Sequence, residues 1–120
     1  AKVTLIAPPT LMPHTLDIPK IHISYDLQKS LHNVDVVMML RLQKERMNGA
    51  YMGSLREFAQ IWGLNHEKLN GTKLILHPGP INRGLEMSSA LIDDMSKQNA
   101  ILDQVTYGVA VRKAVFEMVI

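Results

Sequence analysis

The chain has 120 residues, of which 47% are hydrophobic and 20% are charged, so it is long enough for one domain with a core of ordinary size. Its net charge of +2 comes from 13 basic and 11 acidic residues that are interspersed along the chain, which argues against binding to nucleic acid. The absence of cysteine excludes a disulfide framework, a cysteine-ligated zinc site and a thiol nucleophile, and it fits a cytoplasmic protein. The longest apolar run, Val36 to Leu40, is far too short to cross a membrane.

The first half of the chain is predicted to alternate short strands with helical turns. Val3 to Ala7 and Ile21 to Ser24 are predicted strands. Asp26 is predicted to cap the short helix that follows the second strand and runs to about Leu31. Val34 to Leu40 is the clearest strand, because it is β-branched at its start and almost entirely apolar. Near-continuous apolarity of this kind favours a parallel sheet that is covered on both faces.

A capping pattern predicts a helix after Ser54. The residues Ser54-Leu-Arg-Glu57 match the Ser-x-x-Glu capping box. Phe58, Ile61 and Trp62 are predicted to form the buried stripe of this helix, which is expected to end at Gly63 in the left-handed conformation.

The last third of the chain is predicted to contain one strand and one long helix. Lys73 to Leu76 is the predicted strand, and the helix extends from about Asn99 to Val119. Gly108 costs that helix about 1 kcal/mol relative to alanine, so we expect it to mark the close approach of another backbone. Strands that alternate with helices indicate an α/β fold, with a mainly parallel sheet flanked by helices in a single domain over residues 1–120. The apolar face of the long helix comprises Ile101, Val105, Gly108, Val109, Ala114 or Val115, and Val119.

Arg41 and Gln43 follow the clearest predicted strand, at the edge of the sheet where α/β proteins bind ligands. The two side chains lie on the same face because they are two residues apart. The planar fork of an arginine suits a carboxylate or a phosphate, and a glutamine beside it can both donate and accept hydrogen bonds. An ion pair between Arg41 and a nearby acidic residue is the more common use of such an arginine, and on spacing alone it is favoured.

The turn Pro78-Gly79-Pro80 follows the last predicted strand. Each proline fixes its own φ near −65° and is expected to hold the residue before it in an extended conformation. A backbone restrained in this way presents carbonyl oxygens in set directions. Such a turn suits a site that accepts hydrogen bonds from the NH₂ group of a small substrate.

The histidines do not indicate a metal site or a catalytic base. His77 lies between a predicted strand and Pro78, which favours a buried, hydrogen-bonded structural role over general-base catalysis or metal binding. The chain lacks a glycine-rich phosphate-binding loop, and nothing in it implies a cofactor. The other histidines, His14, His22, His32 and His66, show none of the spacings that are typical of metal ligands.

Two segments taken together closely resemble the C-terminal half of the aspartate carbamoyltransferases. These are Val36-Val-Met-Met-Leu-Arg-Leu-Gln-Lys-Glu-Arg46 and His77-Pro-Gly-Pro-Ile-Asn-Arg-Gly84. The opening residues Val3 to Pro13 resemble an early strand and turn of the aspartate-binding domain of that family, and Gln104 to Val115 resembles its C-terminal helix. The resemblance covers nearly the whole chain in order, and it implies an incomplete doubly wound aspartate-binding domain.

The resemblance implies transfer of the carbamoyl group of carbamoyl phosphate to L-aspartate, an early step of pyrimidine biosynthesis. By position, Arg41 would bind a carboxylate of L-aspartate with Gln43 assisting, and the backbone of Pro78–Pro80 would accept hydrogen bonds from the carbamoyl NH₂ group. The loop of residues 44–53 would close over the second substrate. The resemblance assigns no catalytic residue, metal or cofactor to this chain.

The chain also departs from the family pattern. Family members have an N-terminal carbamoyl-phosphate domain with Ser-Thr-Arg-Thr and His-Pro-Thr-Gln motifs, and neither motif occurs here. The first strand and helix of the aspartate-binding domain are absent as well. We therefore expect the 120 residues alone to be inactive and to depend on the missing N-terminal half. The resemblance implies a homotrimer for the intact protein, with regulatory or dihydroorotase chains as further possible partners.

Two alternatives remain. An ornithine carbamoyltransferase would typically show His-Cys-Leu-Pro where this chain has His77-Pro78-Gly79-Pro80, and Arg41 suits a second carboxylate better than an ornithine amine. A non-catalytic module that binds aspartate or a partner subunit is the other alternative. It would remain inactive even when the missing half is supplied.

Overall fold

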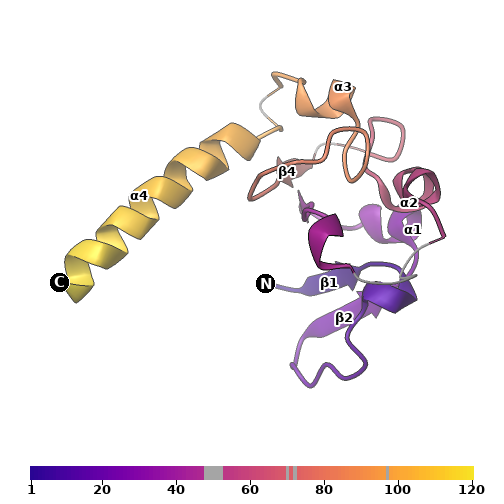
Figure 1. The fold of residues 1–120 in the computed structure, drawn as a ribbon, viewed down its shortest axis with the longest axis horizontal. Coiled ribbons are helices and arrows are strands. Elements are labelled where there is room, and N and C mark those ends of the chain that lie inside the picture. The colour runs from indigo at the N-terminus through magenta and orange to yellow at the C-terminus, as the bar shows by residue number, and fades with distance from the viewer. Residues whose placement is uncertain (48–52, 70, 72, 97) are drawn as a thin grey trace.

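The computed structural model describes residues 1–47, 53–69, 71, 73–96 and 98–120. Within these residues, four strands and three short helices form the body, and a long C-terminal helix projects away from it (Figure 1). The strands are β1 Val3–Ile6, β2 Ile21–Ser24, β3 Val36–Met38 and β4 Leu74–Leu76; the α-helices are α1 Leu27–Leu31, α2 Leu55–Trp62, α3 Ser89–Ile92 and α4 Ile101–Val119; and the two 3₁₀ turns are Pro9–Leu11 and Lys44–Arg46.

The described strands form two parallel pairs. β1 pairs with β2 in a register that joins Val3 to Ile21, and β3 pairs with β4 in a register that joins Val37 to Ile75. The prediction of an α/β fold with parallel strands is confirmed. Within the described part of the chain, the strands form two separate two-stranded sheets. β3 is shorter than the predicted strand of residues 34–40, because only its three central residues pair with β4.

The hydrophobic core lies around the β3–β4 pair. Val37 and Ile75 are partners in the ladder, and both are buried. Leu64, which follows α2, and Met87, which precedes α3, complete the core. Both are buried, and their backbones pair with each other. The buried cluster comprises Leu27, Leu31, Val37, Leu64, Ile75, Met87, Leu91 and Ile101.

The predicted helix caps are confirmed. Asp26 precedes α1, and its Oδ1 accepts a hydrogen bond from the backbone N–H of Lys29 at 3.0 Å. Ser54 precedes α2, and its Oγ accepts from the backbone N–H of Glu57 at 3.0 Å. Both bonds satisfy an N–H group of the first helical turn that has no partner within the helix.

The predicted buried stripe of α2 is correct only in part. Phe58 and Trp62 are half-buried, whereas Ile61 remains 50% exposed. Phe58 and Trp62 are four residues apart and face the same side of the helix, which places Ile61 at the edge of that side. The prediction of a buried Ile61 is therefore wrong.

Gly63 ends α2, but not in the predicted left-handed conformation. Its φ of −68° and ψ of 139° are extended, so that prediction is wrong. The reason for glycine is a close approach, since a Cβ atom here would lie 2.5 Å from the carbonyl oxygen of Leu85 and would also collide with that of Ala59. The ammonium of Lys68 donates to three carbonyl groups at this end of the helix, at 2.7 to 3.1 Å, and so completes its C-terminus.

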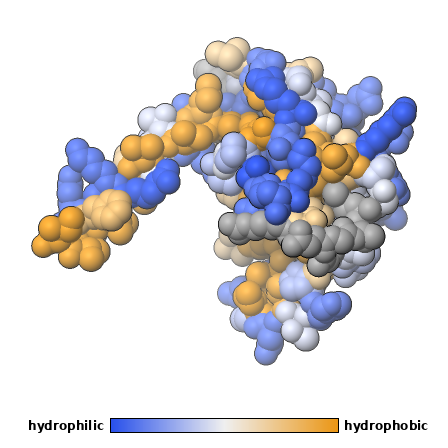
Figure 2. Space-filling model, in the orientation of Figure 1, coloured by the Kyte–Doolittle hydropathy of each residue, from blue (hydrophilic) through white to orange (hydrophobic). Residues whose placement is uncertain are grey.

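The long helix α4 occupies nearly the predicted residues, but its predicted face is not buried. Ile101 packs into the core, and the rest of the helix projects away from the body (Figure 1). Gly108 does not mark a close approach, because the nearest atom to a Cβ built there is a guanidinium nitrogen of Arg112 at 3.6 Å. Figure 2 shows apolar side chains along this helix. The exposed apolar residues of the C-terminal segment are Leu102, Val105, Tyr107, Val109, Val111, Val115, Phe116, Met118, Val119 and Ile120.

Candidate functional site

The carboxyl ends of β3 and β4 lie next to each other. The two strands are parallel, and the ladder continues past β3 with a hydrogen bond from the Met39 N–H to the Leu76 carbonyl at 2.9 Å. The segments that follow, residues 40–47 and 77–86, therefore leave the same edge of the sheet. This is the edge at which open α/β sheets bind ligands, and both predicted site segments occupy it.

Arg41 forms an ion pair on the protein surface. Its Nη1 lies 2.8 Å from Oε1 of Glu45, and its Nη2 donates to Oε2 at 3.2 Å, so the carboxylate meets the guanidinium with both oxygens. The side chains remain 32% and 52% exposed. The structure thus shows the ion pair with a nearby acid. It also shows that this guanidinium holds a carboxylate in a two-pronged geometry.

Gln43 follows Arg41 on the same segment, and its side chain is exposed. Between these two residues lies Leu42, which is buried and anchors the segment to the body. The Lys44 N–H donates to the Leu42 carbonyl at 3.0 Å as the 3₁₀ turn of Lys44–Arg46 begins. In the predicted closing loop of residues 44–53, residues 48–52 lie outside the described part of the chain.

The turn at Pro78, Gly79 and Pro80 differs from its prediction at its centre. Gly79 has a φ of +65°, and the Gly79–Pro80 peptide bond is cis. The expectation that the residue before Pro80 is extended is therefore wrong, because glycine, which lacks a Cβ atom, adopts a positive φ without steric cost. Both prolines are exposed. None of the hydrogen bonds among the described residues uses a carbonyl oxygen of these three residues as its acceptor.

His77 is fully buried directly before this turn. Its Nδ1 accepts a hydrogen bond from the Gly79 N–H at 2.8 Å, and its own N–H donates to the side-chain oxygen of Gln104 at 2.8 Å. Burial lowers the pKa of His77, although the nearby carboxylate of Glu86 acts in the opposite direction. The predicted role as a buried, hydrogen-bonded structural histidine is confirmed.

The half-buried Asn82 and the buried Glu86 form a polar cluster that the sequence reasoning missed. Glu86 is 1% exposed, and its two oxygens accept hydrogen bonds from the backbone N–H and from Nδ2 of Asn82. Nδ2 also donates to the Leu42 carbonyl at 3.0 Å. Asn82 lies within the segment that the resemblance singled out, but no sequence pattern distinguishes a buried glutamate at position 86 from an exposed one.

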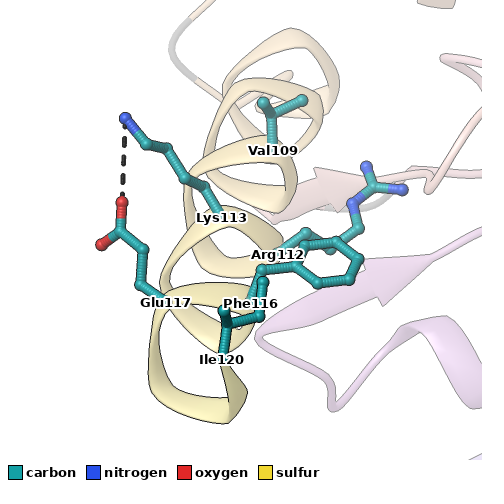
Figure 3. A pocket seen from close by; sticks show the side chains of 6 residues that line it. All are labelled: Val109, Arg112, Lys113, Phe116, Glu117 and Ile120. Carbon is teal, nitrogen blue, oxygen red and sulfur yellow. Dashed lines mark ion pairs between the residues drawn. The ribbon is translucent and has the colours of Figure 1, made fainter.

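The described residues contain no group of three or more His, Asp or Glu side chains placed to hold a metal ion. Within the same residues, no helix is both long and apolar enough to span a membrane. A hollow lies away from the strand ends, along the C-terminal part of α4 (Figure 3). It is lined by Val109, Phe116 and Ile120 together with the aliphatic stems of charged neighbours, so it belongs to the uncovered face of the helix.

Comparisons with known proteins agree on one family. The family described as aspartate/ornithine carbamoyltransferase, Asp/Orn binding domain, matches residues 2–119. The catalytic subunits of aspartate carbamoyltransferase from Parvibaculum lavamentivorans and Cereibacter sphaeroides are 47% and 48% identical over 120 residues, which is 98% of this chain. The chain spans only 36% and 37% of the length of these two relatives.

A solved structure shows the same fold. Aspartate transcarbamoylase from Trypanosoma cruzi, in complex with carbamoyl aspartate and phosphate, superposes with a TM-score of 0.74 and 27% sequence identity. The superposition covers 96% of this chain and 40% of that one. The chain therefore belongs to the aspartate/ornithine carbamoyltransferase family and corresponds to its amino-acid-binding domain.

Proposed function

We propose that this chain is the aspartate-binding part of an aspartate carbamoyltransferase. In this reaction the amine of L-aspartate attacks the carbonyl carbon of carbamoyl phosphate, the bond to the phosphate oxygen breaks, and carbamoyl aspartate and phosphate are formed. The observation that supports the proposal most directly is the parallel β3–β4 pair, which delivers both predicted binding segments to one edge of the sheet. The identity of 44–48% to proteins named as aspartate carbamoyltransferases supports it further.

Arg41 and Gln43 are the proposed binding residues for L-aspartate. The two-pronged contact between Arg41 and Glu45 provides the geometry that a substrate carboxylate requires. Because this pair is partly exposed, solvent screens it and its net stability is small. A substrate carboxylate can therefore share or replace it at little cost, with Gln43 donating or accepting beside it.

The backbone of Pro78, Gly79 and Pro80 is the proposed acceptor for the NH₂ group of carbamoyl phosphate. Its carbonyl oxygens are not used as acceptors by the described residues, and the Gly79 N–H is held by the buried His77 ring. The turn is therefore set in place before substrate arrives. The protein's contribution to the reaction is then the alignment of two substrates and the stabilisation of charge on the tetrahedral intermediate.

The domain is proposed to act together with a carbamoyl-phosphate domain in a longer, cytoplasmic polypeptide that assembles as a homotrimer. The lengths of the relatives support a longer polypeptide, since the chain spans only 36–38% of their length. The apolar surface of α4 supports it as well, because no described residue covers it. Regulatory or dihydroorotase chains are proposed as further partners of the intact protein.

An assay of the intact protein with carbamoyl phosphate tests the proposal. We expect carbamoyl aspartate to form with L-aspartate and no comparable product with ornithine. Ornithine as the preferred acceptor, or no transfer to either amino acid, would contradict it. The 120-residue chain should be inactive alone and should gain activity when the remainder of the protein is supplied separately. A chain that stays inactive after this addition would support a non-catalytic binding module.

A further inference from the structure

We propose that Asn82 is a positioning residue for the transfer reaction, held by the buried carboxylate of Glu86, and that it sets the spacing between the two halves of the candidate site. This inference rests on the proposed function. The Nδ2 group of Asn82 donates to the Leu42 carbonyl at 3.0 Å. Among the described residues, this is the hydrogen bond that joins the segment of residues 40–47 to the segment of residues 77–86.

The acceptor of this bond lies at the centre of the proposed aspartate site. The Leu42 carbonyl belongs to the peptide group between Leu42 and Gln43, and Arg41 is the preceding residue. The side chain of Leu42 is buried, and its carbonyl also accepts from the Lys44 N–H. Two donors and an apolar anchor therefore hold this peptide group, so its position controls where Arg41 and Gln43 extend from the sheet.

Glu86 determines which way the Asn82 amide points. Both oxygens of Glu86 act as hydrogen-bond acceptors, so the group of the amide that faces them is the NH₂ end. One oxygen of Glu86 accepts from this NH₂ group at 3.2 Å, and the other accepts from the Asn82 backbone N–H. The second hydrogen of Nδ2 is then directed to the Leu42 carbonyl. Both oxygens of Glu86 and the NH₂ group of Asn82 are thereby paired, which favours this one orientation of the amide.

The same carboxylate connects to the turn on the carbamoyl side. Nε2 of His77 lies 3.7 Å from Oε1 of Glu86, and both side chains are at most 1% exposed. Because Nδ1 of His77 accepts from the Gly79 N–H, the neutral ring carries its proton on Nε2, on the side of Glu86. One continuous series of contacts thus connects the two halves. It runs from the Pro78–Pro80 turn through His77, Glu86 and Asn82 to Leu42.

Kinetics of the intact protein with Asn82→Ala test the proposal. We expect the KM for L-aspartate to rise about tenfold, a change equivalent to about 1.4 kcal/mol. The dissociation constant of inorganic phosphate, measured by titration in the absence of aspartate, should change less than twofold. A role in folding alone would instead lower the amount of active protein and leave the KM for aspartate unchanged.

Asn99→Ala is the matched control. Nδ2 of Asn99 donates to the carbonyl groups of Leu91, Ile92 and Asp94 at 3.0 to 3.1 Å, away from both site segments. This variant loses a comparable set of half-buried hydrogen bonds, so we expect lower stability with an unchanged KM for aspartate. An unchanged KM in Asn82→Ala, or an equal rise in Asn99→Ala, would overturn the proposal.

Glu86→Gln provides a second test in case Asn82→Ala does not fold. It keeps the volume of the side chain but places an NH₂ group or a weaker acceptor against Asn82, so the KM for aspartate should again rise. A wild-type KM in this variant would overturn the proposal. An unaltered intact protein that forms no carbamoyl aspartate would overturn the proposed function itself, and the inference with it.

Discussion

The strand-end region around β4 and the helix α4 are both rich in apolar residues, yet they are buried to opposite extents. Around β4, Ile75, Met87 and Leu91 are at most 3% exposed, and the buried carboxylate of Glu86 accepts two hydrogen bonds from Asn82. Along α4, Phe116 and Met118 are 66% and 86% exposed. The first region is completed by residues within this chain, whereas the second requires a surface that the described residues do not supply.

The largest expected effect is on the free energy of unfolding, and it is tested by truncating one methionine in each region. Met87→Ala removes a fully buried side chain and should lower the free energy of unfolding by about 3 kcal/mol, within the usual range of 2–5 kcal/mol for such truncations. Met118→Ala, on the exposed helix, should change it by less than about 0.5 kcal/mol. Urea denaturation of the 120-residue chain measures both values. If both variants lost the same free energy of unfolding, α4 would have to be covered in solution.

Arg41→Ala tests whether the strand-end region binds substrate. Loss of a two-pronged, charged contact should reduce kcat/KM for L-aspartate by about 100-fold, which corresponds to about 2.7 kcal/mol. Arg41→Lys should recover only part of this, because an ammonium cannot reproduce the planar fork. Steady-state kinetics of the intact protein provide the measurement, and Arg56→Ala, on the exposed side of α2, is the control. Similar kinetics for Arg41→Ala and the control would contradict the assignment.

Phe116→Ala tests whether the apolar face of α4 is covered in the intact protein. In the 120-residue chain this exposed side chain should contribute almost nothing to stability. In the intact protein, where we propose that the helix is covered, the same substitution should cost about 2 kcal/mol, because burial of an aromatic side chain contributes about 1.5–3 kcal/mol. Denaturation of both forms, with and without the substitution, gives the comparison. A negligible cost in both forms would mean that the face stays exposed.

The smallest expected effect is a pH dependence that arises from His77. Burial lowers the pKa of His77 below its ordinary value of about 6.5, so the unfolded chain binds its proton more readily than the folded chain. The neutral ring therefore contributes stability above about pH 6.5, and this contribution is lost as the pH falls below that value. His77→Asn keeps an acceptor near the Gly79 N–H but does not titrate. Unfolding at pH 7.5 and 5.5 should show a larger decrease for the unaltered protein, and equal decreases would contradict this assignment.

The sequence predicted best those features that depend on atoms a few residues apart. The caps at Asp26 and Ser54 each need one side-chain oxygen and a backbone N–H three positions later. The strands and the long helix follow from local apolar patterns. Gly63 and Gly79 show where local rules were insufficient. Glycine is required at position 63 because another backbone approaches closely, and at position 79 because φ is positive, and the local sequence does not distinguish these two reasons.

The sequence by itself determined the α/β class, the four strands, the helices after Asp26 and Ser54, the long C-terminal helix and the two motifs that identify the family, but not the short helix α3 at Ser89–Ile92. Tertiary structure alone decided that Asn82 meets Leu42 across 40 positions of the chain, that Glu86 is buried beside His77, and that α4 projects away from the body. Local patterns are encoded by neighbouring residues, which the sequence displays directly. Burial and long-range hydrogen bonds depend instead on which distant segments the fold brings together, and one chain's residue pattern does not specify those pairings.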